Sequence, residues 1–239
     1  MNFNPNVQTI DMPGKMKRPL DGVQLNKVMR GVYGWMTMGL AITAFVSILL
    51  STTGFIPSQI MFFVVIIAQF GIVIGLSARM HKLSPTNAGL LFFTYSALTG
   101  VTFSIIFLVY PIGSIAAAFV STAGVFAAMT VVGMTTKTDL SQYSSYFMMG
   151  LIGLFIAMFV NFLLGSALID YVISIFGVLL FTGLTAYDTQ RIANMAADPR
   201  LALDPDNTLK FSVMAALTLY LDFINLFLFM LRLFGGGRD

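Results

Sequence analysis

Two aspartates lie within long apolar segments of this chain, where charged side chains are rare. Asp222 is near the middle of residues 210–233, KFSVMAALTLYLDFINLFLFMLRL, and Asp188 is near the end of the apolar residues 172–191. An ionised carboxylate at bilayer depth costs several kcal/mol, so such residues usually face a protein interior and are usually functional. We therefore expect the two carboxyl groups to meet inside a helical bundle and to form a protonation-sensitive site.

The chemistry of such a pair is limited by its surroundings. Two carboxylates at hydrogen-bonding distance in a low dielectric cannot both ionise cheaply, so they share one proton. Loss of that proton adds charge, which repels the two helices or attracts a cation. Calcium prefers about six to eight oxygen ligands, and two aspartates cannot supply them without water. The sequence therefore predicts a weak, transient calcium site at Asp188 and Asp222, which suits a leak better than a buffer.

Other polar residues share the helix faces of the two aspartates. Thr218, Asp222 and Asn225 are spaced i, i+4, i+7, which places them on one face of a helix, and Thr185 is one turn before Asp188. A polar stripe of this kind faces inward, because lipid would leave its hydrogen-bonding groups unsatisfied. These threonine and asparagine side chains are the predicted supporting residues of the pair.

Arg79 is a further candidate, because it follows the apolar residues 55–78. Gly71 and Gly75 precede it at four-residue intervals, a small-residue spacing that allows helices to pack closely. Small residues also line one face of residues 96–104, and Gly124 and Ala128 repeat the spacing. These motifs favour a packed bundle and carry no chemistry of their own.

Each candidate also has a structural interpretation. Asp188 would then be a helix-end carboxylate solvated at the membrane interface, and Asp222 a hydrogen-bonding group between helices. Arg79 would be an interfacial arginine that only fixes topology. We interpret Asn161 as an interhelical hydrogen-bonding residue rather than a ligand. The sequence DPDN at 204–207 lacks the spacing and the terminal Glu of an EF-hand, so it is interpreted as a turn and helix cap.

Composition identifies the class of protein. Of 239 residues, 57% are hydrophobic and only 10% are charged, whereas soluble domains carry about 25% charged residues. The chain contains no cysteine, which excludes disulfides, thiol catalysis and cysteine metal sites, and its single histidine, His81, excludes a multi-histidine metal centre. The sequence therefore predicts an all-α integral membrane protein in which residues 1–30 form a polar arm and residues 31–235 form one bundle.

Seven apolar segments reach or approach the roughly 20 residues that a helix needs to cross the hydrocarbon. The sixth is expected to be the shortest, and residues 189–208 are expected to form a long polar loop. The predicted spans are residues 31–50, 55–78, 88–110, 115–134, 146–168, 171–187 and 210–233.

The distribution of basic residues predicts the orientation. Of the 13 Lys and Arg residues, all except Arg232 and Arg238 fall in the N-terminal arm or in the loops between spans two and three, four and five, and six and seven. Because basic residues accumulate on the cytoplasmic side, we expect a cytoplasmic N-terminus and an external C-terminus. The basic arm could also bind anionic lipid head groups, although fixing the orientation is the simpler interpretation.

Five segments of the sequence resemble one known family. The chain is similar to the Bax inhibitor family, also called the transmembrane Bax inhibitor motif proteins, over nearly the whole membrane region and in the family's order. Lack of cysteine and of eukaryotic sorting signals favours a bacterial member of the inner membrane. The segments are VYGWMTMGLAITAFVS (32–47), LSARMHKLSP (76–85), GLLFFTYSALTGVTFS (89–104), FTGLTAYDTQRI (181–192) and LYLDFINLFLFMLRLFG (219–235).

The resemblance implies a fold of six helices around a central C-terminal helix, and a calcium leak channel controlled by pH. It implies that Asp188 and Asp222 form a hydrogen-bonded pair on the last two helices, and that Arg79 on the second helix latches this pair. Residues 189–208 are expected to form a longer loop than in compact bacterial members.

Two other classes of function remain open from the sequence. One is an interaction protein that restrains a membrane protease or a cell-death partner, and the other is a proton-coupled carrier that uses the same carboxylates. An enzyme is not expected, because the membrane segments contain no Ser/His or metal cluster and the chain has no GxxxxGK phosphate loop. The expected partners are the bilayer, protons and permeant calcium ions, with a membrane protein partner possible; no tightly bound cofactor and no nucleic acid is expected.

Overall fold

The computed structural model describes residues 22–79, 82–198, 201 and 204–235. Most of the predicted arm, residues 1–21, and His81 lie outside the described residues. The predicted arm ended at residue 30, but the first helix begins at Gly22. Residues 22–30 therefore belong to that helix and not to the arm.

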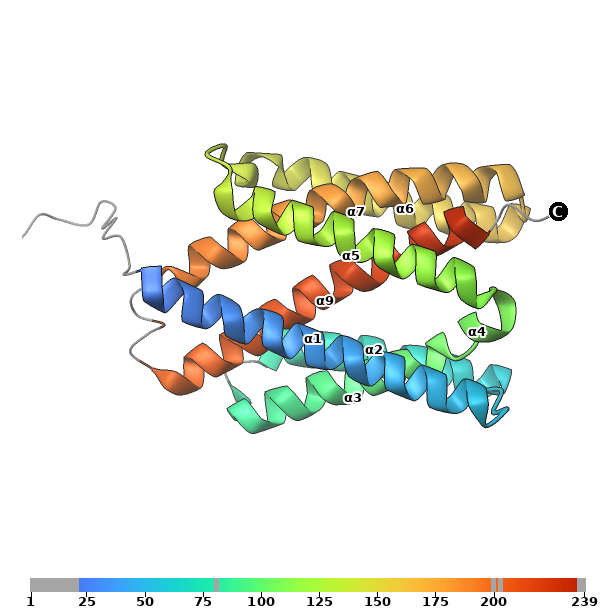
Figure 1. Cartoon of the computed structure of the whole chain (residues 1–239), viewed down its shortest axis with the longest axis horizontal. Helices are drawn as coiled ribbons and strands as arrows, with labels where there is room; N and C mark the ends of the chain where they lie inside the picture. The colour runs from blue at the N-terminus through green and yellow to red at the C-terminus, as the bar shows by residue number, and fades with distance from the viewer. Residues whose placement is uncertain (1–21, 80–81, 199–200, 202–203, 236–239) are drawn as a thin grey trace, which may run out of the picture.

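Seven helices of the described chain are long and apolar enough to cross a membrane, which confirms the predicted all-α class. In order, the elements are α1 (Gly22–Thr52), α2 (Gln59–Arg79), α3 (Pro85–Phe103), α4 (Ile106–Val109), α5 (Ile112–Thr135), the 3₁₀ turn η2 (Leu140–Tyr143), α6 (Ser144–Leu164), α7 (Ala167–Ala196) and α9 (Pro205–Gly235) (Figure 1). Helices satisfy their own backbone hydrogen bonds, which lipid cannot do for them.

The third span is interrupted, although the sequence predicted one helix over residues 88–110. Helix α3 ends at Phe103 and the short α4 begins at Ile106. At the break, the Ser104 hydroxyl donates to the Val101 carbonyl oxygen at 2.7 Å. Hydroxyl side chains that bond back to the preceding turn compete with the helical ladder and favour such breaks.

The turn between α6 and α7 comes earlier than predicted. Helix α6 ends at Leu164, because Gly165 adopts a left-handed conformation with φ of 65°, which glycine tolerates without steric cost. The Ser166 hydroxyl then caps α7 by accepting from the Ile169 N–H. Asp170 therefore lies in the first turn of α7 and not in the connection between helices.

Helix α7 is much longer than the predicted span 171–187, and it also contains the first part of the predicted loop 189–208. It runs from Ala167 to Ala196, a length of 30 residues. Its last two turns remain helical because they are amphipathic: Ile192 and Ala196 are buried, while Arg191, Asn194 and Met195 are exposed. Asp188 consequently lies well inside a helix, eight residues before its end at Ala196.

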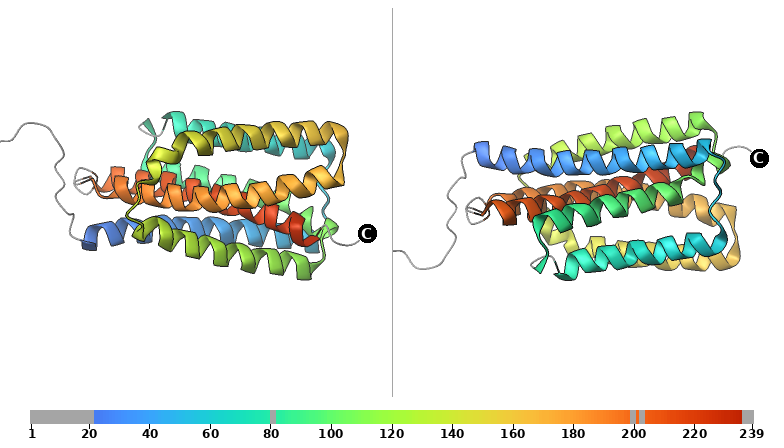
Figure 2. Two further views of the ribbon diagram at one scale, coloured as in Figure 1. Left: turned by 90° about the horizontal axis from the view of Figure 1, so that it is seen from above. Right: turned by 90° about the horizontal axis from the view of Figure 1, so that it is seen from below.

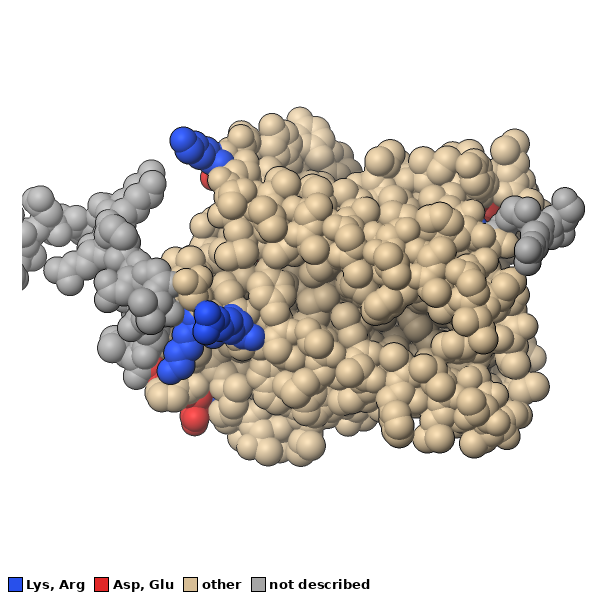
Figure 3. All heavy atoms as spheres, viewed as in Figure 1, with Lys and Arg blue, Asp and Glu red and all other residues tan. Residues whose placement is uncertain are grey.

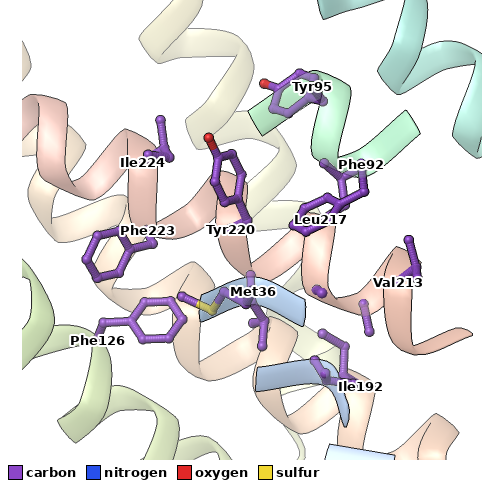
Figure 4. Packing of buried hydrophobic residues seen from close by; sticks show 14 of the residues in the cluster. Met36, Phe92, Tyr95, Phe126, Ile192, Val213, Leu217, Tyr220, Phe223 and Ile224 are labelled. Carbon is purple, nitrogen blue, oxygen red and sulfur yellow. The ribbon is translucent and has the colours of Figure 1, made fainter. Parts of the chain in front are cut away.

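Helix α9 forms the centre of the bundle, which confirms the predicted arrangement of six helices around the last one. The two views of Figure 2 show three layers, with α1 and α5 on one side, α3, α9 and α7 in the middle, and α2 and α6 on the other side. Leu219, Tyr220 and Leu226 of α9 are fully buried. Figure 4 shows Tyr220 and Phe223 surrounded by side chains of other helices, including Met36, Phe92 and Phe126.

Close helix contacts fall at only some of the small residues. A side chain at Gly100 would overlap Val46 and the Thr43 carbonyl oxygen of α1. Gly71, Gly75 and Gly124, in contrast, have open space where a side chain would lie. The small-residue spacing before Arg79 therefore does not mark a helix contact.

Charged residues lie at the two ends of the bundle. Figure 3 shows lysine and arginine gathered at the end where α1 begins, and a nearly uncharged surface between the two ends. We call this end the basic end; its described basic residues are Lys27, Arg30, Arg79, Lys82, Lys137, Arg191 and Lys210. The sides expose large apolar residues such as Ile60 and Phe162, as expected for surfaces in contact with lipid.

Candidate functional site

Asp188 of α7 and Asp222 of α9 face each other inside the bundle. Their exposed fractions are 8% and 5%, and the two carboxyl groups are within hydrogen-bonding reach of each other. Asp222 Oδ2 is buried and has no hydrogen-bond partner among the described residues. Since neither ionised carboxylate can donate, a hydrogen bond between the two groups requires that one of them carries a proton.

The helix packing explains why the two side chains meet. Helices α7 and α9 pack against each other along much of their length. Asp188 is between the fully buried Thr185 and Thr189 on α7, and Asp222 is between the buried Tyr220 and Phe223 on α9. Burial of both carboxyls in the same helix interface is the arrangement that the sequence predicted.

The predicted supporting residues do not donate hydrogen bonds to the pair. The Thr185 hydroxyl donates to the Phe181 carbonyl oxygen at 2.7 Å, and the Thr218 hydroxyl donates to that of Met214 at 3.3 Å. The Asn225 amide donates to the carbonyl oxygen of Leu221 at 2.8 Å. Each of these side chains therefore donates its hydrogen bond to the backbone of its own helix. These residues shape the surroundings of the aspartate pair and do not neutralise its charge.

The predicted latch, Arg79, does not contact the pair in this structure. It is exposed at the last residue of α2, and within the part of the chain that the structure describes no ion pair joins it to Asp188 or Asp222. The positive charge that acts on Asp188 belongs instead to Arg191, one turn further along α7. Sequence reasoning missed Arg191 because residues 189–208 were predicted to be a loop; its i, i+3 spacing from Asp188 is the signal that a continuous helix would have provided.

A cavity of about 320 Å³ lies at the basic end, between α7 and α9. We call it the basic-end cavity, and Asp188 contributes to its wall. The lining residues are Asp188, Arg191, Ile192, Met195, Phe211, Met214, Ala215 and Thr218.

A second cavity of about 390 Å³, which we call the mid-bundle cavity, lies between α2, α3, α6 and α9. Its polar lining consists of Gln69, Tyr95, Thr99, Thr102 and Asn225, and its apolar lining of Phe70, Val73, Phe103, Phe155, Leu221, Ile224 and Leu228. The Gln69 amide donates to the Thr99 hydroxyl at 2.9 Å.

One face of α9 links the two cavities. Phe211, Met214 and Thr218 line the basic-end cavity, and the same face continues through the mid-bundle cavity with Leu221, Asn225 and Leu228. These six residues are half-buried, whereas most of the rest of this part of α9 is buried. Asp188 lines the basic-end cavity, and Asp222 follows Leu221, the first residue of α9 that lines the mid-bundle cavity, so the aspartate pair lies beside both cavities.

The described residues contain no group of three or more His, Cys, Asp or Glu side chains that could hold a metal ion. Asp188 and Asp222 alone supply at most four carboxylate oxygens, fewer than the about six to eight that calcium prefers. The chemistry of this donor set therefore fits a calcium ion that keeps most of its water, and it does not fit a tightly bound resident ion.

Comparison with known proteins assigns the family. A family model described as "Inhibitor of apoptosis-promoting Bax1" matches residues 25–239. The chain belongs to the Bax inhibitor family. This assignment confirms the resemblance that the sequence segments indicated, and with the seven apolar helices it identifies a multi-pass membrane protein of the Bax inhibitor family that contacts the lipid bilayer.

Bacterial relatives cover most of this Bax inhibitor family chain. The inner membrane protein YbhL of Escherichia coli (strain K12) is 48% identical over 221 residues, which is 90% of this chain and 93% of the relative. An uncharacterized protein of Borreliella burgdorferi is 45% identical over 219 residues, 90% of this chain and 94% of the relative. An uncharacterized protein of Deinococcus radiodurans is 40% identical over 218 residues, 90% of this chain and 93% of the relative.

Proposed function

We propose that this protein is a pH-sensitive, calcium-permeable leak channel, and that the Asp188–Asp222 pair gates it. The observation that carries this proposal is the burial of the pair beside two cavities: Asp188 lines the basic-end cavity, and Asp222 follows Leu221, which lines the mid-bundle cavity. Membership of the Bax inhibitor family is consistent with a channel. We also infer an inner-membrane location, as the name of YbhL states for that relative, with the basic end in the cytoplasm.

The gate follows from the electrostatics of the pair. While the two carboxyls share one proton, the pair carries one negative charge and a hydrogen bond holds α7 to α9. When the proton leaves, two like charges remain in a poorly solvated site and repel each other. A hydrated calcium ion offsets that repulsion for a short time, because the pair lacks the oxygens to hold it. Separation of α7 from α9 at this point would join the two cavities.

Calcium flux into proteoliposomes tests the proposal. The purified protein is reconstituted into vesicles that contain a calcium indicator, and the initial rate is measured from mildly acidic to mildly alkaline pH. Asp188→Asn and Asp222→Asn remove the titrating group but keep a side chain of similar shape, so each should change or abolish the pH dependence. Asp206→Asn, an exposed substitution in the first turn of the same α9 helix, should keep the wild-type profile.

The outcomes separate the candidate functions. Wild-type pH dependence in both Asn variants would contradict the gating role of the pair. Saturable calcium uptake that requires a proton gradient would identify a proton-coupled carrier. Absence of any calcium flux from correctly folded wild-type protein would contradict the channel and leave the interaction protein as the better explanation.

A further inference from the structure

Arg191 contributes to the walls of two separate cavities at the basic end. One is the basic-end cavity, where it lies one turn from Asp188. The other, which we call the loop cavity, has a volume of about 320 Å³ and is lined by Asp139, Ser141, Tyr187, Gln190, Arg191, Asn194 and Met195. Arg191 is exposed to solvent and lies where the linings of the two cavities overlap.

Gln190 holds the neighbouring loop in place beside Arg191. Its amide donates to the Thr138 carbonyl oxygen at 2.9 Å, and its carbonyl oxygen accepts from the Leu140 N–H at 2.7 Å. These two bonds fix the segment before η2 against α7, and Asp139 thereby becomes part of the wall that Arg191 also forms.

Asp139, which lines the loop cavity together with Arg191, carries a negative charge at neutral pH. Hydrogen bonds from the Ser141 hydroxyl and the Ser141 backbone N–H lower the pKa of Asp139 below its usual value. The described titratable groups on the walls of the two cavities are therefore Asp139, Tyr187, Asp188 and Arg191, with Asp222 behind Asp188. Arg191 is the only basic side chain among these lining residues.

We propose that Arg191 is a selectivity-determining residue, whose positive charge at the mouth of the basic-end cavity opposes the entry of cations and whose effect Asp139 weakens. The proposal rests on the channel function proposed above. An ion that enters this cavity must pass close to the guanidinium, within the Debye length of about 8–10 Å. The interaction energy is proportional to the charge of the ion, so Arg191 opposes a divalent cation twice as strongly as a monovalent one in free energy.

Paired flux measurements at one fixed pH test this inference. For Arg191→Gln we expect the potassium rate to rise about twofold and the calcium rate about fourfold, since doubling the ionic charge squares the factor. Asp139→Asn should have the opposite effect and lower the calcium rate. Arg191→Lys should retain wild-type rates. Lys137→Gln should retain them as well, because Lys137 is an exposed residue of the loop that contains Asp139 and lines neither cavity.

A chemical version of the experiment separates charge from shape. The chain contains no cysteine, so Arg191→Cys introduces a single thiol. Modification with a thiosulfonate reagent that carries an ammonium group should return the calcium rate toward the wild-type value, and a reagent of similar size that carries a sulfonate should raise it further. Equal effects of the two reagents would overturn the proposal, as would equal factors for calcium and potassium in Arg191→Gln.

The failure of this inference can be distinguished from the failure of the channel itself. If the wild-type protein conducts both ions and Arg191→Gln conducts them at the same rates, only the role of Arg191 is overturned. Absence of flux of both ions from the wild-type protein overturns the channel and the role of Arg191 together.

Discussion

The hydroxyl groups of Thr43 on α1 and Tyr220 on α9 lie 2.7 Å apart in the middle of the bundle. The Thr43 hydroxyl is also 2.9 Å from the Ser96 carbonyl oxygen of α3, so this polar contact joins three helices. Tyr220 is fully buried, and the rings of Phe92 and Tyr95 meet it edge-on at centroid distances of 5.7 and 5.8 Å. A polar contact in a core that is otherwise apolar fixes the rotation of α9 relative to α1 and α3.

We predict that Tyr220→Phe lowers the free energy of unfolding by about 0.5–1.5 kcal/mol, the usual net contribution of one buried hydrogen bond. Thr43→Val should have a similar effect. Because the two hydroxyls bond each other, the double variant should lose less stability than the sum of the two single variants. Thermal unfolding in detergent measures this coupling. Thr94→Val is the control, because its exposed hydroxyl bonds only its own helix, at Leu90; strictly additive losses would contradict the contact.

At the end opposite the basic end, Arg232 and Asp170 form an ion pair of 3.3 Å between α9 and α7. Their side chains are 31% and 46% exposed, and ion pairs exposed to solvent contribute only about 0–1 kcal/mol. The Arg232 guanidinium also lies 5.5 Å from the centre of the Phe229 ring. We therefore predict a larger loss of stability for Arg232→Ala than for Asp170→Asn, since the first removes both contacts.

Salt concentration provides the check on this prediction. The loss caused by Asp170→Asn should disappear in unfolding experiments at high salt, because screening already removes the ion pair in the wild-type protein. A salt-independent loss would contradict the ion pair as the source of the stabilisation.

Gly133 marks the tightest approach of α5 to α7. A side chain there would overlap the backbone carbonyl oxygen of Ala186, and a backbone group cannot rotate away. We predict that Gly133→Ala destabilises the protein by about 1–3 kcal/mol, the usual effect of overpacking a filled interface. Gly124→Ala on the same helix should be neutral or slightly stabilising, since open space surrounds that position and alanine favours helix. Equal stability of the two variants in detergent would contradict this packing.

Gln190 anchors the loop before α6 by two hydrogen bonds, to Thr138 and Leu140. We predict that Gln190→Ala increases amide hydrogen exchange in residues 136–143 by about 30-fold, because the two lost hydrogen bonds contribute roughly 1 kcal/mol each. Exchange within α5 and α6 should remain at wild-type rates. A uniform increase over the whole chain would indicate general destabilisation and not a local release of the loop.

The sequence was sufficient to predict the bundle and the burial of Asp188 and Asp222 within it. Lipid requires helices wherever the chain is apolar for about 20 residues, and it rejects carboxylates that are not turned inward. These two constraints depend only on residue type and position along the chain. For that reason the predictions of seven helices, a central α9 and two buried aspartates agree with the structure.

Arg191 could not be found in the same way. Hydropathy indicates where the chain leaves the hydrocarbon, but it does not indicate where a helix ends. Helix α7 continues for two amphipathic turns after Asp188, held by Ile192 and Ala196. Because the hydropathy pattern predicts a loop for those turns, it does not indicate that Asp188 and Arg191 lie at i, i+3 on one helix.

The position of Arg79 relative to the pair also depends on packing that the sequence does not contain. Small residues before it, Gly71 and Gly75, suggested a close helix contact, yet both face open space and α2 packs mainly on α3. The same spacing at Gly100 does mark a close contact with α1. Which small residues touch another helix is decided by neighbours far along the chain, so the role of Arg79 as a latch remains a prediction.

The central position of α9 has a consequence for biogenesis. Translation proceeds from the N-terminus at roughly 5–20 residues per second, so six membrane-spanning helices are made before the helix around which they assemble. Their inward faces have no permanent partner until the ribosome has finished the last 31-residue helix. A nascent chain that stops before α9 therefore lacks the helix on which α1, α3, α5 and α7 pack, and it would expose buried surfaces of these helices to the membrane's quality-control proteases.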